Sequence, residues 1–161
     1  MKFLITLLIL LGLSINLNSV HAASSGGSSG GSITGSSLYK SGKKLVIKAK
    51  KLEEKNKIAK AESLYLKALD KLEKAYAKDK KNADILNYLG YSLRKTGNLE
   101  KAETFYLKGL KLDSGALGIN EYLGELYVQT GRMELAKERL EVLNGCKCEE
   151  YDELKELIEK N

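Results

Sequence analysis

The chain has 161 residues and a net charge of +6, from 27 Lys and Arg against 21 Asp and Glu, and it is long enough for one domain. Its single histidine, His21, lies in an N-terminal segment that we expect to be removed. The mature chain would then have no imidazole for Ser-His or Cys-His catalysis or for metal binding. Composition therefore argues against most hydrolase mechanisms, and we expect no enzyme.

The first 22 residues have the pattern of a secretory signal peptide. Lys2 supplies a positive charge, residues 3–13 are almost entirely apolar, and Val20-His21-Ala22 is the small-x-small pattern that signal peptidase recognises. The apolar run is shorter than the roughly 20 residues that a membrane span needs. We therefore expect cleavage after Ala22, no stable membrane anchor afterwards, and a periplasmic or secreted location.

Residues 23–37 are rich in Gly and Ser and are predicted to form a flexible linker before a domain at 38–161. Charge is uneven within that domain. Residues 38–82 carry 15 lysines against six acids, whereas residues 83–161 carry 11 basic groups against 15 acids. An exported protein rarely meets nucleic acid, so we expect solvated lysine faces and no nucleic-acid partner. Binding of the basic half to an anionic surface stays open.

An internal repeat follows. Apolar residues recur at three- and four-residue spacing from residue 38 and proline is absent, which predicts helices throughout. Residues 83–116 and 117–147 superpose when shifted by 34 positions. The residues that coincide are Tyr88 and Tyr122, Leu89 and Leu123, Gly90 and Gly124, Gly97 and Gly131, and Ala102 and Ala136.

Small residues at these positions have a physical purpose. Gly90 and Gly124 allow the two helices of a repeat to approach closely. Gly97 and Gly131 suit the turn between them, where a left-handed backbone is cheap only for glycine. The coinciding alanines are small where the two helices cross.

This pattern resembles the tetratricopeptide repeat. The resemblance implies an all-α, right-handed solenoid of three helix-pair repeats at about 42–82, 83–116 and 117–147, followed by a capping helix at 149–160. In the degenerate first repeat Asn56 takes the turn position. The spacing from the first repeat to the second is seven residues longer than 34, so its second helix is predicted to run from about Ile58 to Asp79.

The resemblance also implies a concave groove lined by the first helix of each repeat, where the family binds peptides or protein segments. The candidate groove residues are Lys43, Lys50, Asn87, Tyr91, Arg94, Glu121 and Glu125. This lining is basic at one end and acidic at the other, so we expect a partner segment of complementary charge. A clamp for a C-terminal carboxylate at Lys50 and Asn87, a carbohydrate platform at Tyr88 and Tyr122, and a merely solvated face remain alternatives. No cofactor or metal is implied.

The only two cysteines, Cys146 and Cys148, fall between the last repeat helix and the cap. In an oxidising compartment we expect them to form a local disulfide that stiffens this connection with a modest gain in stability. An intermolecular disulfide, copper(I) held by two thiolates and thiol redox chemistry are the alternatives. The closing segment resembles small exported proteobacterial tetratricopeptide proteins ending in C-x-C-E-E-Y. We therefore expect an interaction module or scaffold, with a thiol-based metal or redox protein as its rival.

Overall fold

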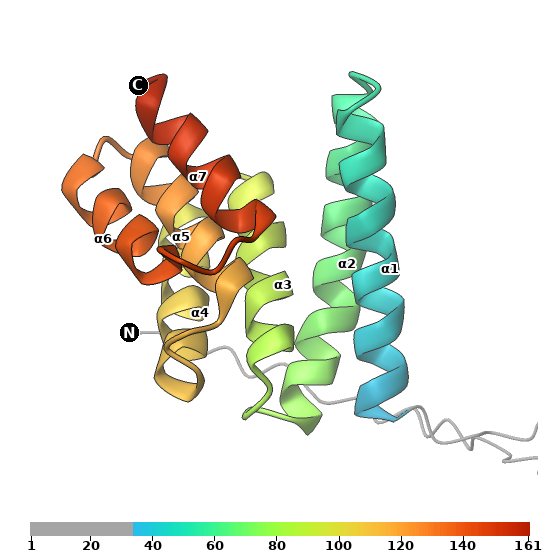
Figure 1. Ribbon diagram of the computed structural model, residues 1–161. Helices are drawn as coiled ribbons and strands as arrows, with labels where there is room; N and C mark the ends of the chain where they lie inside the picture. Colours follow the sequence, from blue (N-terminus) through green and yellow to red (C-terminus); the bar gives the residue numbers. More distant parts are fainter. Residues whose placement is uncertain (1–33) are drawn as a thin grey trace, which may run out of the picture. The chain divides into compact units, whose positions relative to one another are not determined.

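The computed structural model describes residues 34–161, which fold into seven helices and contain no strand (Figure 1). In chain order the helices are α1 Gly35–Glu53, α2 Ile58–Lys78, α3 Ala83–Lys95, α4 Leu99–Leu112, α5 Leu117–Gln129, α6 Met133–Leu143 and α7 Glu149–Glu159. None of these helices is long and apolar enough to cross a membrane. The expected signal peptide at 1–22 and most of the expected linker lie outside the described residues.

The helices pack as consecutive pairs, α1 with α2, α3 with α4 and α5 with α6. Each pair packs against the next, and α7 packs against α5 and α6 at the end of the stack (Figure 1). The predicted all-α solenoid of helix pairs is confirmed. The first helices of the three pairs, α1, α3 and α5, lie next to one another and form a face that we call the inner face.

The turn within each pair has the same geometry. Asn56, Gly97 and Gly131 adopt φ values of 53°, 84° and 72°, in the left-handed region where we expected a turn. In each turn the next backbone N–H donates to a carbonyl five residues earlier, with N···O distances of 2.8 Å in all three. This is the Schellman motif, which satisfies carbonyls that the end of a helix leaves without a partner.

The first pair is longer than the other two. Helix α2 ends at Lys78, which confirms the predicted extension. Helix α1 corrects a boundary, because it begins at Gly35, inside the expected linker and seven residues before the expected start of the first repeat. The physical reason is that Thr34 caps the helix by accepting a hydrogen bond from the Ser37 N–H, and that the extra turns of α2 offer Leu72 as a packing partner for α1.

Close approach between neighbouring helices depends on glycine at particular positions. A Cβ atom at Gly90 would lie 2.5 Å from Cε1 of Tyr106, whose ring is fully buried, and one at Gly124 would lie 2.5 Å from Cδ2 of Leu154. Both distances are too short for a real contact. Gly90 therefore sets the spacing of α3 and α4, as expected. Gly124 was expected to face the other helix of its own repeat; instead it sets the approach of α7 to α5, because Leu154 of the cap packs on it.

We expect Gly90→Ala to lower the free energy of unfolding by about 1–2 kcal/mol, because overpacking against the Tyr106 ring exceeds the helix-propensity gain of about 1 kcal/mol. Gly109→Ala is a matched control in the next helix. Its new Cβ also meets an atom at 2.5 Å, but that atom is the flexible end of Ile119. Urea unfolding followed by circular dichroism measures both variants, and equal losses would contradict the argument.

Candidate functional site

The seven candidate groove residues all lie on the inner face, but they fall into two groups. Lys50 of α1, Tyr91 and Arg94 of α3, and Glu121 and Glu125 of α5 come together in one network. The other two, Lys43 and Asn87, lie outside it. The network is largely buried, so only part of the expected groove lining is accessible to a partner.

Tyrosine rings form the middle of the network. The Tyr91 ring, whose residue is only 5% exposed, lies between Tyr65 and Tyr122, with centroid distances of 5.8 and 4.6 Å. The Lys50 ammonium group lies 5.6 Å from the centroids of both Tyr91 and Tyr122 and donates to the Tyr122 hydroxyl at 3.3 Å. Lys50 therefore connects the first helix pair with the third across α3.

Arg94 joins the rings to the acidic side of the network. Its guanidinium group lies 5.4 Å from the Tyr91 centroid, and Nη2 pairs with Oε2 of Glu125 at 2.5 Å. The two side chains are only 9% and 21% exposed. Burial opposes the charged form, but Tyr106 and Glu125 outweigh it and raise the pKa of Arg94 above its ordinary value. Tyr91 and Arg94 were expected to line an open groove; instead they hold α1, α3 and α5 together.

The acidic end of the network continues into α7. Carboxylate oxygens of Glu121, Glu125 and Glu153 lie within 4.8 Å of one another. Glu121 is only 3% exposed; burial is the main cause that raises its pKa to about 9, and Glu153 and Glu125 add to the effect. Three carboxylates can hold a cation, but Glu125 is already paired with Arg94, and calcium needs six or more oxygen ligands. We assign no metal to this group.

Sequence reasoning missed the contribution of α7. Glu149, Glu150 and Glu153 line a cavity of about 110 Å³ together with Lys50, Glu121 and Tyr122. The sequence predicts only a capping helix at residues 149–160. A signal was nevertheless present, because a cap that packs on α5 brings its first turn close to the acidic positions of the third repeat.

The other end of the inner face, which we call the open end, carries the half-buried side chains of Lys43, Asn87 and Tyr88. The Lys43 ammonium group lies 5.3 Å from the Tyr88 centroid and 6.0 Å from that of Tyr39. Beside Tyr88, Oδ1 of Asn87 is shielded from solvent and has no hydrogen-bond partner among the described residues. Gly118 faces this amide without a side chain, since a Cβ there would lie 3.1 Å from Asn87 Nδ2. The Asn87 amide thus packs closely against Gly118, and its Oδ1 is left without a hydrogen bond among the described residues.

The two rings of the alternative carbohydrate platform, Tyr88 and Tyr122, are both partly buried. Tyr122 packs against Tyr91 and hydrogen-bonds Lys50, while the Tyr88 ring packs against Tyr39 under Lys43. Each ring is thus engaged with a neighbouring helix. The carboxylate clamp at Lys50 and Asn87 is not assembled either, since Lys50 belongs to the network and Asn87 to the open end.

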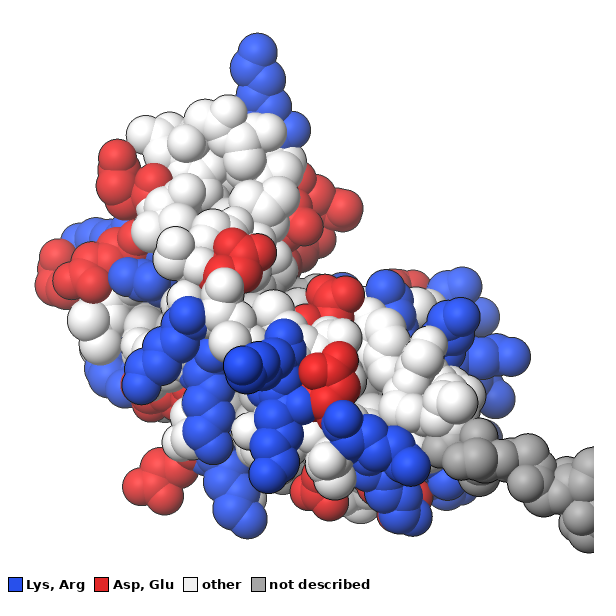
Figure 2. All heavy atoms as spheres, turned by 90° about the horizontal axis from the view of Figure 1, so that it is seen from below, with Lys and Arg blue, Asp and Glu red and all other residues white. Residues whose placement is uncertain are grey.

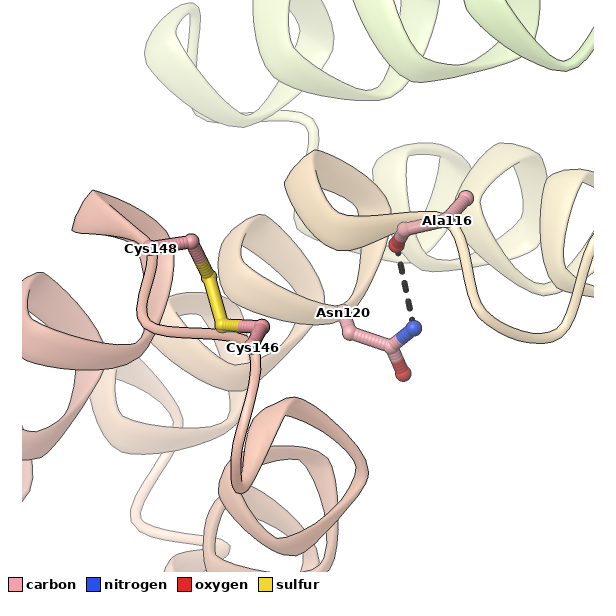
Figure 3. Close-up of a disulfide and its surroundings, with 4 residues drawn as sticks. All are labelled: Ala116, Asn120, Cys146 and Cys148. Atoms are coloured by element: carbon pink, nitrogen blue, oxygen red, sulfur yellow. Dashed lines mark hydrogen bonds between the residues drawn. A yellow bond between two sulfur atoms is a disulfide. The ribbon is translucent and has the colours of Figure 1, made fainter.

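Cys146 and Cys148 are joined by a disulfide in the connection before α7 (Figure 3). Their Cα atoms are 5.2 Å apart, and the intervening Lys147 adopts a φ of 51°. Figure 3 also shows Asn120, which is fully buried and donates to the Ala116 carbonyl at the start of α5. A disulfide has no thiolate to bind copper or attack a substrate. For the protein in solution the pairing stays a prediction, which intact-mass measurement with and without a reductant checks.

Charge is mixed over the lower face of the structure. Figure 2 shows Lys and Arg side chains spread over much of that face, with acidic and uncharged residues between them. Such a surface resembles the solvated lysine faces expected from the sequence more than one continuous basic patch.

The comparisons with known proteins agree with the fold. Residues 83–116, which contain α3 and α4, match the family profile of the tetratricopeptide repeat. The type III secretion translocator chaperone SycD of Yersinia enterocolitica is 17% identical, with a TM-score of 0.58 over 80% of this chain and 92% of that one. The second tetratricopeptide domain of human RPAP3, in complex with an HSP70 peptide, is 19% identical, with a TM-score of 0.53 over 79% of this chain and 99% of that one.

SycD in complex with a peptide of the translocator YopD is also similar, at 19% identity and a TM-score of 0.52 over 73% of this chain and 86% of that one. No curated protein sequence matches significantly. The chain is therefore a helical-repeat protein. More specifically, it contains a tetratricopeptide repeat at 83–116 and has the tetratricopeptide fold, which confirms the resemblance seen in the sequence. The likeness to exported proteins ending in C-x-C-E-E-Y stays a prediction.

Proposed function

We propose that this protein is a non-catalytic interaction module that binds a peptide or protein segment along its inner face. Two proteins of the same fold, SycD and RPAP3, have been solved with bound peptides, which supports this class of function. The observation that carries the proposal is the open end of the inner face around Asn87. There Lys43 lies over the Tyr39 and Tyr88 rings without a carboxylate partner among the described residues, and the same end holds Asn87, whose shielded Oδ1 has no hydrogen-bond partner there.

An extended segment suits this place. A buried acceptor without a hydrogen bond costs about 1–3 kcal/mol, and rotation of the Asn87 side chain toward the surface would let a backbone N–H of a bound segment supply the missing donor. Lys43 beside Tyr39 and Tyr88 adds a positive charge and aromatic surface. An acidic side chain of the segment is therefore favoured at this end.

A pull-down from an extract of the protein's own cells tests the proposal. We expect the immobilised full chain to capture a partner that is lost when Lys43→Glu and Asn87→Ala are combined. Lys101→Glu, an exposed change on α4, is the matched control and should leave capture intact. Capture that survives the inner-face change but disappears with Cys146→Ser and Cys148→Ser would favour the thiol-based alternative instead.

We further propose that the protein is exported and acts in the periplasm or outside the cell. The support is the signal-peptide pattern of the first 22 residues. N-terminal sequencing of the protein from fractionated cells should give Ala23 as the first residue. Recovery of the cytoplasmic protein with an intact N-terminus would contradict export without affecting the binding proposal.

A further inference from the structure

A small cavity opens between α1, α5 and α7, at the acidic end of the inner face. Its volume is about 110 Å³, and its lining consists of Lys50, Glu121, Tyr122, Glu149, Glu150 and Glu153. A water molecule occupies about 30 Å³ in the liquid, so the cavity has room for a few waters or for one polar head group. The proposed binding segment would pass its mouth on the way from α1 to α5.

The cavity carries an excess of negative charge. Four carboxyl groups line it, and Lys50 is the single cation in the lining. Glu149 and Glu150 lie in the first turn of α7, where the helix dipole contributes about half a positive charge. Even with Glu121 protonated, three carboxylates therefore face about one and a half positive charges, and a further cation would be stabilised there.

Glu121 is the deepest of these carboxyls. It is only 3% exposed and pairs with no basic side chain within the described part of the chain. Burial is the main cause that raises its pKa to about 9. A buried carboxyl without a cationic partner is costly in its ionised form, so the arrival of a cation would stabilise it.

Lys50 already shows what kind of group the cavity accepts. Its ammonium group enters from α1, yet it hydrogen-bonds the Tyr122 hydroxyl and forms no ion pair with a carboxylate among the described residues. The carboxylates of Glu149, Glu150 and Glu153 are thus available to a second cationic group. Glu125 is not available, because Arg94 holds it.

We infer that this cavity binds the ammonium or guanidinium group of a Lys or Arg side chain carried by the partner segment. The inference rests on the proposed function and adds the orientation of the bound segment along the inner face. The basic residue of the segment lies over α5 and α7, and its acidic residue lies over Lys43 near the other end. A side chain is favoured over a metal ion because Glu125 is withdrawn and Lys50 already enters the cavity.

Nuclear magnetic resonance of the full chain tests the inference without a known partner. The probe is N-acetyl-arginine amide, and N-acetyl-citrulline amide is its uncharged counterpart. We expect arginine to cause saturable shifts in the backbone amides of residues 120–125 and 149–153, and citrulline to cause none. Glu153→Gln should weaken arginine binding at least about fivefold at pH 7, since each lost charge contact is worth about 1 kcal/mol or more. Glu121→Gln should change binding little at this pH, because the Glu121 carboxyl is already protonated there.

Two further variants complete the design. Glu149→Gln combined with Glu153→Gln changes only exposed residues and should also weaken binding, so a folding defect cannot explain the loss. Glu100→Gln, on the exposed side of α4, should bind arginine normally. Equal shifts with both probes, or saturable shifts with calcium chloride but not with arginine, would overturn the inference. If arginine fails while capture still depends on Lys43 and Asn87, the proposed function stands and only the cavity assignment falls.

Discussion

Arg94→Met is expected to lower the free energy of unfolding by about 3 kcal/mol, as measured by urea denaturation at neutral pH. Removing one partner of a buried ion pair leaves the other charge uncompensated, which typically costs about 3–5 kcal/mol. The lower value applies because Glu125 keeps 21% of its side chain exposed. The loss also includes the contacts of the guanidinium group with the Tyr91 and Tyr122 rings.

A double variant separates charge from packing. Arg94→Met combined with Glu125→Leu removes both charges and should recover much of the loss, because apolar replacement of a whole buried pair is often neutral. Lys43→Met, on the same face but outside the network, should leave stability nearly unchanged. If Arg94→Met alone is as stable as the wild type, the network does not hold the helices together. The same reasoning means that replacing Arg94 or Tyr91 cannot by itself test partner binding.

The second large effect is a fall in stability with rising pH that depends on Glu121. The unfolded chain releases this proton near the ordinary pKa of 4.5, whereas the folded chain keeps it up to about 9. Between these values the unfolded state binds fewer protons, so stability decreases as pH rises. The full shift would amount to roughly 6 kcal/mol at about 1.4 kcal/mol per unit. We expect about 2–3 kcal/mol, because the cavity admits solvent that can hydrate the ionised carboxylate.

Glu121→Gln is neutral at every pH and should remove this dependence. Groups facing Glu121 come from three helices, namely Lys50 from α1, Tyr122 and Glu125 from α5, and Glu149, Glu150 and Glu153 from α7. Urea unfolding at pH 5, 7 and 9 should show that the free energy of unfolding of Glu121→Gln rises relative to that of the wild type as pH increases. Glu100→Gln should have the same pH dependence as the wild type. Parallel profiles for all three proteins would contradict the role of Glu121.

Much of the fold could be predicted because its signals are local. A glycine at a fixed offset predicts the turn at Gly97, and the same logic with Asn56 locates the turn of the degenerate repeat, where no glycine marks it. The length of α2 followed from the extra seven residues. The start of α1 did not, because Gly35 and Ser37 have linker composition and become helical only with a Thr34 cap and a packing partner in α2.

The candidate site was predicted in part. Repeat register placed all seven groove residues on α1, α3 and α5, since facing direction follows from helical periodicity. Register cannot tell whether a face is open, because that depends on side chains from other helices. Tyr65 of α2 and Tyr122 of α5 enclose Tyr91, and α7 covers Glu121. Their effect is visible only once the helices are packed.

The sequence by itself determined the helical repeat, its turns and the charge difference between the two halves of the chain, because each depends on residue type at short spacing. The tertiary structure alone decided which inner-face residues bind one another and which remain free. Contacts such as Lys50 with Tyr122 join residues 72 positions apart. The packing of three helix pairs and a cap thus separates an open end at Lys43 and Asn87 from an acidic cavity at Glu121, and no local pattern carries that information.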